Sequence, residues 1–165
     1  MSMTHYMELL AVNQPWNLML FMAIPVILAE TVAISELYLL HTRDYAGRVR
    51  QLNRAAGIAA GAYFLGVFAW LMTQAVLPIT AAGAWRGPAD MIAVGFYLLG
   101  VVPLVGIALL DLRLVGGRDQ HRAMAIHASC VGLFLVVAHV AMIFGMLDPT
   151  LLGSAPAHAA HAAIH

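Results

Sequence analysis

The sequence has little charge, no lysine and a single cysteine. Only 10% of its 165 residues are charged, against about 25% in a typical soluble domain, so an ordinary water-exposed surface is excluded. The eight basic residues are all arginines and are balanced by eight acidic residues. This removes the basic excess that a nucleic-acid partner requires. The single Cys130 cannot form an internal disulfide or a cysteine-based zinc cage.

Apolar residues, in contrast, make up 62% of the chain and fall into four long runs. Each run has about the 20 residues that a membrane-spanning helix needs, and none alternates with the period of two expected of a membrane β-barrel. We therefore predict an all-α polytopic membrane protein whose partner is the lipid bilayer. A four-helix transmembrane bundle is expected over residues 1–153, followed by a mobile Ala- and His-rich tail, 154–165. The predicted spans are about 17–40, 55–78, 88–112 and 123–147.

The arginines indicate how this bundle is oriented. Seven of them fall in loops 41–54 and 113–122, which four spans place on the same side of the membrane, and Arg86 lies on the other side. Basic loops face the cytoplasm in membrane proteins. We expect these two loops in the cytoplasm and both termini outside, which in a bacterial inner membrane means the periplasm.

Small residues and prolines inside the spans indicate how the helices pack. Gly57 and Gly61 have GxxxG spacing, which lets helix backbones approach closely. We expect this face to pack within the chain; the alternative is a homo-oligomer or a larger membrane complex formed through it. Pro25 and Pro103 are predicted to kink their helices.

A group of ionisable residues is expected near the cytoplasmic end of the bundle. An ionisable side chain inside a span costs about 2.5–3.5 kcal/mol on insertion scales, so Glu36, Asp111 and His127 need a partner or a purpose. His41 is expected at nearly the same depth as His127. Two imidazoles from separate helices would suit a six-coordinate haem b. Alternatively, His41 is an interfacial histidine and His127 a hydrogen-bonded core residue, or a bare metal ion binds here.

Two further sets of candidate binding residues are three arginines near the haem site and a histidine–methionine pair toward the other end of the bundle. The arginines expected to pair with haem propionates are Arg50, Arg54 and Arg122. Toward the other end, His139 and Met142 could bind copper, because thioether and imidazole suit that metal, or they fill space as ordinary packing residues. The predicted ligands of a transition metal such as copper or iron are His139, Met142, Glu36 and Asp111.

Glu30 stands alone near the middle of the first span. A carboxylate there is expected either to relay protons or cations, or to stay protonated and hydrogen-bonded to a neighbour such as Thr31, Tyr63 or Gln74.

Three functions compete on these observations. The first prediction is a haem-b subunit that transfers electrons to or from a quinone, and it depends on the pairing of His41 with His127. The second is a transporter of protons or metal cations that uses the intramembrane Glu and His residues. The third is an accessory subunit of a larger membrane complex, suggested by the small size and small-residue faces. Whether the protein is an enzyme stays open.

Overall fold

The computed structural model describes residues 3–44, 46–114 and 120–149, and these residues form helices and connecting turns without a strand. Four helical stretches within them are long and apolar enough to cross a membrane, which indicates a membrane protein. They coincide with the four apolar runs of the sequence. Their bounds are Trp16–Thr42, Arg48–Ala82, Pro88–Asp111 and Arg122–Met146. The predicted tail 154–165 lies outside the described residues.

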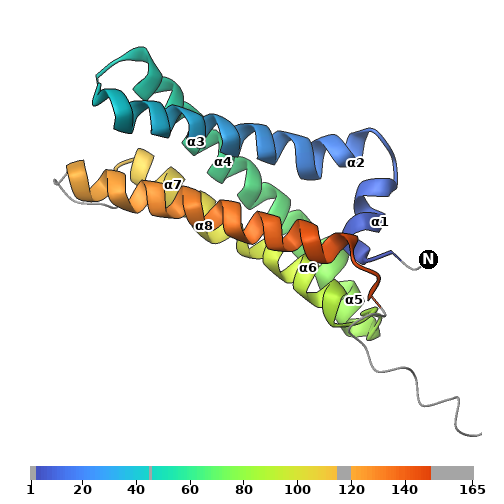
Figure 1. The fold of residues 1–165 in the computed structure, drawn as a ribbon. Helices are drawn as coiled ribbons and strands as arrows, with labels where there is room; N and C mark the ends of the chain where they lie inside the picture. The colour runs from blue at the N-terminus through green and yellow to red at the C-terminus, as the bar shows by residue number, and fades with distance from the viewer. Residues whose placement is uncertain (1–2, 45, 115–119, 150–165) are drawn as a thin grey trace, which may run out of the picture.

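These stretches consist of several helical elements with a short helix before them. In chain order the elements are α1 (His5–Ala11), α2 (Trp16–Leu18), the π-helix η1 (Met19–Ala23), α3 (Ile24–Thr42), α4 (Arg48–Leu71), the π-helix η2 (Met72–Val76), α5 (Leu77–Ala82), α6 (Pro88–Leu99), α7 (Val101–Asp111) and α8 (Gln120–Met146). The α3–α4 loop, the end of α7 and the start of α8 lie at one end of the bundle (Figure 1). Helix α1 and the α5–α6 turn lie at the opposite end.

Two prolines each follow a π-helical segment. Pro25 is the second residue after η1 and Pro78 the second residue after η2, and each lies in the first turn of the α-helix that follows. Proline lacks the N–H of a normal helix and its ring collides with the carbonyl four residues earlier. The wider π turn relieves that collision, so the second helical stretch continues to Ala82 instead of ending at Pro78 as the sequence predicts. The third stretch breaks at Gly100, just before Pro103.

Two tyrosines donate to backbone oxygens of η1, beside the point where Pro25 supplies no N–H. Pro25 has no N–H to donate to the oxygen of Phe21, four residues earlier, or to that of Leu20, five residues earlier. The hydroxyl of Tyr97 donates to the Phe21 oxygen at 2.6 Å, and the hydroxyl of Tyr63 donates to the Leu20 oxygen at 2.9 Å. These bonds join η1 to α6 and α4.

The glycines of α4 pack against α7 inside the chain. Gly57 and Gly61 are both buried, and a Cβ on Gly61 would lie 2.5 Å from the Ala108 Cβ and 2.7 Å from the Leu104 oxygen. This contact brings the two backbones close together, which is the intrachain packing predicted for this face. A homo-oligomer or a larger membrane complex formed through this face stays a prediction.

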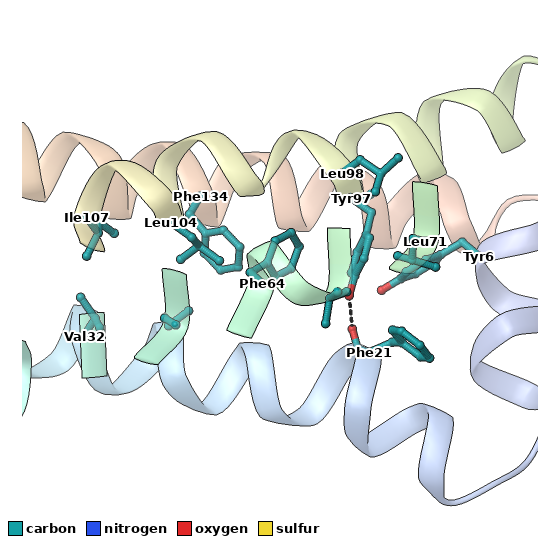
Figure 2. Packing of buried hydrophobic residues seen from close by; sticks show 14 of the residues in the cluster. Tyr6, Phe21, Val32, Phe64, Leu71, Tyr97, Leu98, Leu104, Ile107 and Phe134 are labelled. Atoms are coloured by element: carbon teal, nitrogen blue, oxygen red, sulfur yellow. Dashed lines mark hydrogen bonds between the residues drawn. The ribbon is translucent and has the colours of Figure 1, made fainter. Parts of the chain in front are cut away.

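Aromatic rings fill the centre of the bundle. Phe64 of α4 packs between Tyr97 of α6 and Phe134 of α8, with ring centroids 5.2 and 6.2 Å away, respectively. Figure 2 shows these rings between the helices, with Tyr6 of α1 beside Tyr97. The outer surface is also apolar: Ile34 and Leu37, for example, are both 70% exposed. Such a surface suits lipid and not water.

Candidate functional site: a buried acid–histidine–acid triad

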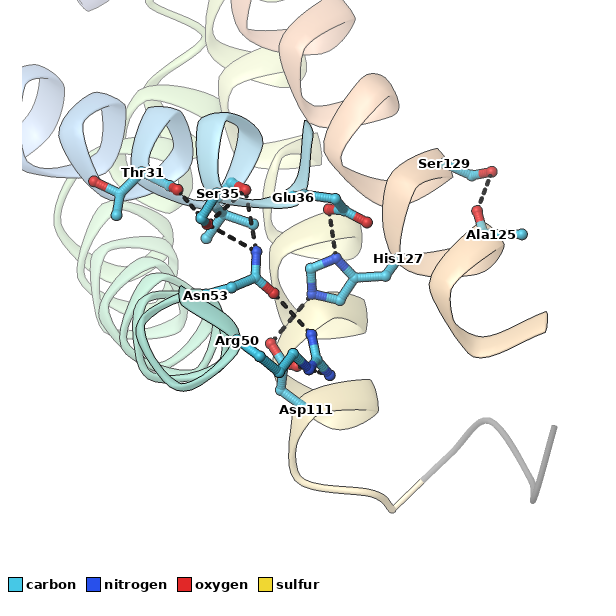
Figure 3. A network of polar contacts seen from close by, with 10 residues as sticks. Thr31, Ser35, Glu36, Arg50, Asn53, Asp111, Ala125, His127 and Ser129 are labelled. Carbon is cyan, nitrogen blue, oxygen red and sulfur yellow. Dashed lines mark hydrogen bonds and ion pairs between the residues drawn. The ribbon is translucent and has the colours of Figure 1, made fainter. Parts of the chain in front are cut away.

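The structure places a histidine between two carboxylates at the arginine-rich end of the bundle. His127 of α8 lies with Nδ1 2.7 Å from Oε2 of Glu36 on α3, and with Nε2 3.2 Å from Oδ2 of Asp111 at the end of α7. Figure 3 shows the imidazole ring between the two acidic side chains. Three helices therefore each contribute one titratable group, and we call Glu36, His127 and Asp111 the triad.

The triad is closed off from solvent. Glu36, His127 and Asp111 are 3%, 2% and 1% exposed. Glu36 Oε1 is buried without a hydrogen-bond partner among the described residues. Buried polar atoms are nearly always paired, so an unpaired carboxylate oxygen next to a histidine is an unusual feature that calls for a chemical explanation.

The two contacts of His127 can both be hydrogen bonds only if the triad holds an additional proton. A neutral imidazole carries one N–H, so it can donate to only one of two carboxylates. For both contacts to be hydrogen bonds, either the ring carries two protons or one carboxyl group is protonated. In both cases the triad holds one proton more than two carboxylates and a neutral ring. With Arg50 included, the charges then sum to zero, which suits a site removed from water.

Arg50 and Asn53 of α4 hold Asp111 and connect it to α3. The Arg50 guanidinium donates to Oδ1 of Asp111 at 3.2 Å and to Oδ1 of Asn53 at 2.8 Å. Asn53 is fully buried and donates to the hydroxyl of Ser35 at 2.9 Å. Gly57 leaves room for the acid, because a Cβ on this residue would collide with Asp111 Oδ2. The close α4–α7 packing therefore positions one member of the triad.

Two of the three arginines predicted to bind haem propionates contact Asp111. Arg50 pairs with the Asp111 carboxylate, and Nε of Arg54 donates to the Asp111 backbone oxygen at 2.8 Å. Arg122 is exposed in the first turn of α8.

The structure does not bring His41 to His127. His41 is exposed near the end of α3, whereas His127 is buried in the triad. Successive residues turn by 100° around a helix, so His41 lies about 140° from Glu36 and points away when Glu36 points inward. Both ring nitrogens of His127 already contact carboxylates. A haem iron could bind this ring only by displacing one of these acids.

The other predicted ligands are separated as well. His139 and Met142 are exposed on α8, and His139 Nδ1 lies 2.6 Å from the oxygen of Leu135 on the same helix. They are more than three helical turns from His127. Across residues 3–44, 46–114 and 120–149, no three His, Cys, Asp or Glu side chains are grouped so that they could hold a metal ion. Glu30 is exposed on α3 and does not join the triad.

A second buried acid lies at the opposite end of the bundle, where the sequence predicted no site. Asp90 of α6 is fully buried and accepts from the backbone N–H groups of His5 and Arg86, at 2.6 and 3.3 Å. Its Oδ2 is also 2.5 Å from His5 Nδ1. Arg86 also pairs with Glu8 of α1. These contacts fix α1 across this end, and Thr4, which caps α1, donates to the oxygen of Gly145 at 2.6 Å.

Several of these residues lack a strong sequence signal. Asn53 and Ser35 are uncharged and look like ordinary residues of a helix end or span. Asp90 follows Pro88 closely and looks like an acidic residue in a first helical turn. Thr4 ahead of an apolar segment is a helix-start signal that could have revealed α1.

Comparison with known proteins indicates a family and no assigned activity. No curated protein and no solved structure matches the chain. A match to DUF6803, a family of unknown function, covers residues 1–161. Because this match extends over nearly the whole sequence, the chain belongs to the DUF6803 family of unknown function.

Proposed function

We propose that this protein transfers protons in a membrane and that the triad is its proton-binding site. The observation that carries the proposal is the buried His127 ring, which contacts one carboxylate through each nitrogen. Ionisable residues inside membrane spans are rare, and chains of Asp, Glu and His form the proton relays of pumps and transporters. Histidine suits this role because its ring can accept a proton on one nitrogen and release one from the other.

The contacts define a direct proton step. A proton on Glu36 Oε2 can move to Nδ1 of His127 while the proton on Nε2 moves to Asp111 Oδ2. Glu36 then carries the negative charge that Asp111 carried before, and the ring stays neutral. The site is reset when Asp111 releases its proton, the ring proton returns from Nδ1 to Nε2 and Glu36 takes up a new proton.

Groups beside the triad provide a path for a proton to leave Asp111 and a path for a proton to reach Glu36. Asp111 contacts Arg50, whose side chain is 27% exposed, so this side leads toward water at the arginine-rich end. On the other side of the ring, Glu36 has the unpaired oxygen Oε1, which can accept a proton. Glu30 is the next ionisable group on α3, six residues or about 9 Å along the helix. It is the candidate for the following relay position.

The proposed orientation places the triad in the cytoplasmic half of the membrane. The arginine-rich segments meet at one end of the bundle, which supports cytoplasmic loops and external termini. A variant with Cys130→Ala can carry one new cysteine at either end, at His41 or at Met3. In intact cells, a membrane-impermeant thiol reagent should label the cysteine at position 3 and spare the one at position 41. The reverse labelling pattern would refute this orientation.

Proton flux into vesicles tests the function. The purified protein is reconstituted into liposomes that contain a pH-sensitive dye, and a potassium gradient with valinomycin drives protons inward. We expect acidification faster than in protein-free vesicles. Glu36→Gln and Asp111→Asn should reduce the rate to that of protein-free vesicles, since each amide can no longer exchange a proton with His127.

His41→Gln is the matched control, because His41 lies at the same end of the bundle but is exposed and outside the triad. This variant should keep the wild-type rate. The proposal fails if wild-type protein that remains helical and monodisperse gives no flux, or if Glu36→Gln and Asp111→Asn both conduct like wild type.

A further inference from the structure

A second feature lies between α3 and α8, farther from the arginine-rich end than the triad. Here the two helices border a cavity of about 250 Å³. Its walls include the rings of Phe21, Phe64, Tyr97 and Phe134, which belong to η1, α4, α6 and α8. Figure 2 shows three of these rings, those of Phe64, Tyr97 and Phe134, grouped between the helices. The cavity therefore offers an apolar, aromatic surface inside the membrane-spanning part of the bundle.

Two polar side chains line this cavity from opposite helices. Glu30 belongs to α3 and His139 to α8, and both are exposed. The Leu135 oxygen can only accept, so Nδ1 of His139 donates to it and Nε2 of the neutral ring remains an acceptor. Glu30 makes no hydrogen bond or ion pair with any residue in the described part of the chain.

A membrane makes these two groups costly. An ionisable side chain facing hydrocarbon costs about 2.5–3.5 kcal/mol on insertion scales. A molecule that forms hydrogen bonds with both Glu30 and His139 would offset part of that cost. It must reach the cavity from the lipid, so it must be mostly apolar, and it must present polar atoms to two opposing helices.

We propose that this cavity binds the head group of a lipid-soluble quinol. Its flat ring can stack on the aromatic walls. Its two hydroxyl groups lie on opposite sides of that ring, where one can donate to the Glu30 carboxyl group on α3 and the other to Nε2 of His139 on α8. The volume is slightly below the 300 Å³ or so at which ligand pockets begin. It therefore suits a single ring, with the prenyl tail left in the surrounding lipid.

This site shares no residue with the triad. Glu30, the candidate for the next relay position, lines the cavity, but occupation of the cavity does not depend on proton transfer. Binding can therefore be measured without a flux assay, and the two proposals can fail separately.

Tryptophan fluorescence provides the measurement. The ring of Trp70 lies 5.2 Å from that of Phe21, which lines the cavity. Protein with Trp16→Phe and Trp85→Phe, which keeps Trp70 as its single tryptophan, is placed in lipid nanodiscs and titrated with a decyl-substituted benzoquinol that is kept reduced under argon. We expect saturable quenching of the Trp70 fluorescence, which yields a Kd.

Substitutions at the two polar groups test the assignment. Glu30→Gln and His139→Leu, made in the same background, should each raise the Kd by about tenfold, the effect of losing one hydrogen bond worth roughly 1.4 kcal/mol. Both positions are exposed, so the fold should tolerate these changes. His41→Leu is the matched control, since His41 is exposed on α3 outside the cavity, and it should leave the Kd unchanged.

Competition with oleic acid identifies the other possible occupant. If oleic acid leaves the quinol bound while Glu30→Gln and His139→Leu weaken binding, the quinol assignment holds. If oleic acid displaces the quinol and both variants bind like wild type, the cavity holds an acyl chain and the proposal is overturned. Quenching that rises linearly without saturation in the wild-type background also overturns it.

Discussion

Glu36 and His127 are 91 residues apart in the chain, yet Oε2 of the first and Nδ1 of the second lie 2.7 Å apart inside the bundle. This contact joins the first and last of the four long helices. A buried pair of this kind is not necessarily stabilising in itself, because both groups lose their hydration. Breaking it is costly, however, because the remaining partner stays buried without compensation.

Substitution of the central histidine should therefore destabilise the protein. In His127→Leu, Glu36 and Asp111 remain buried and lose the group between them, so we expect a loss of about 3–5 kcal/mol. Thermal unfolding in detergent, followed by circular dichroism, measures it. His139→Leu on the same helix replaces an exposed histidine and should change stability little. Equal unfolding temperatures for the two variants would contradict the buried network.

The bond from Tyr97 to Phe21 should contribute more because Pro25 lacks an N–H. Tyr97→Phe leaves the Phe21 oxygen unpaired in a buried position, at a cost of about 1–3 kcal/mol. Pro25→Ala restores a helical donor, so Tyr97→Phe should cost less in that background. A double-mutant cycle from thermal unfolding checks this coupling. Additive effects would show that the hydroxyl does not replace the missing helical bond.

Two glycines of α4 should respond in opposite directions to the same substitution. Gly61→Ala places a methyl group against Ala108 and Leu104 of α7, and such overpacking costs about 1–3 kcal/mol. Gly66 has open space where a Cβ would lie, so Gly66→Ala should stabilise the helix by about 0.5–1 kcal/mol. Unfolding in detergent distinguishes them, and a stabilising Gly61→Ala would contradict the close α4–α7 approach.

Helix α1 should loosen at high pH. Burial removes water from the phenol of Tyr6 and raises its pKa from 10.0 to about 12. Because the folded state disfavours the phenolate, this contribution to stability is complete below pH 10 and is lost as the pH rises toward about 12. Unfolding temperatures measured across this range should fall more steeply for wild type than for Tyr6→Phe. Parallel curves would show that Tyr6 ionises as freely as an exposed tyrosine.

The apolar runs were sufficient to predict the four long helices, but not how they pass through their prolines. Hydrophobic length alone indicates where a helix can cross lipid. Pro78 looked like an end, because a proline inside an α-helix costs a hydrogen bond. The π-helix η2 removes that conflict, and a π turn has no signal in hydrophobic periodicity.

The sequence predicts how deep the triad residues lie in the bundle, but not toward which side of its helix each side chain points. Counting residues from the span ends placed Glu36, His127, Asp111 and His41 at similar levels in the bundle. It does not show which helix face points inward, and that difference separates His41 from the other three. Asn53 could not be inferred because a single uncharged polar residue has the same pattern in a core as at a helix end.

The hydrogen bond from Thr4 to Gly145 spans 141 residues. Tyr6 packs so closely on Gly145 that a Cβ there would lie 2.6 Å from its ring. Gly145 lies near the end of α8 and is synthesised 141 residues after Thr4. Chains are synthesised from the N-terminus at about 5–20 residues per second. Helix α1 can therefore dock on α8 only after α8 has been synthesised and inserted.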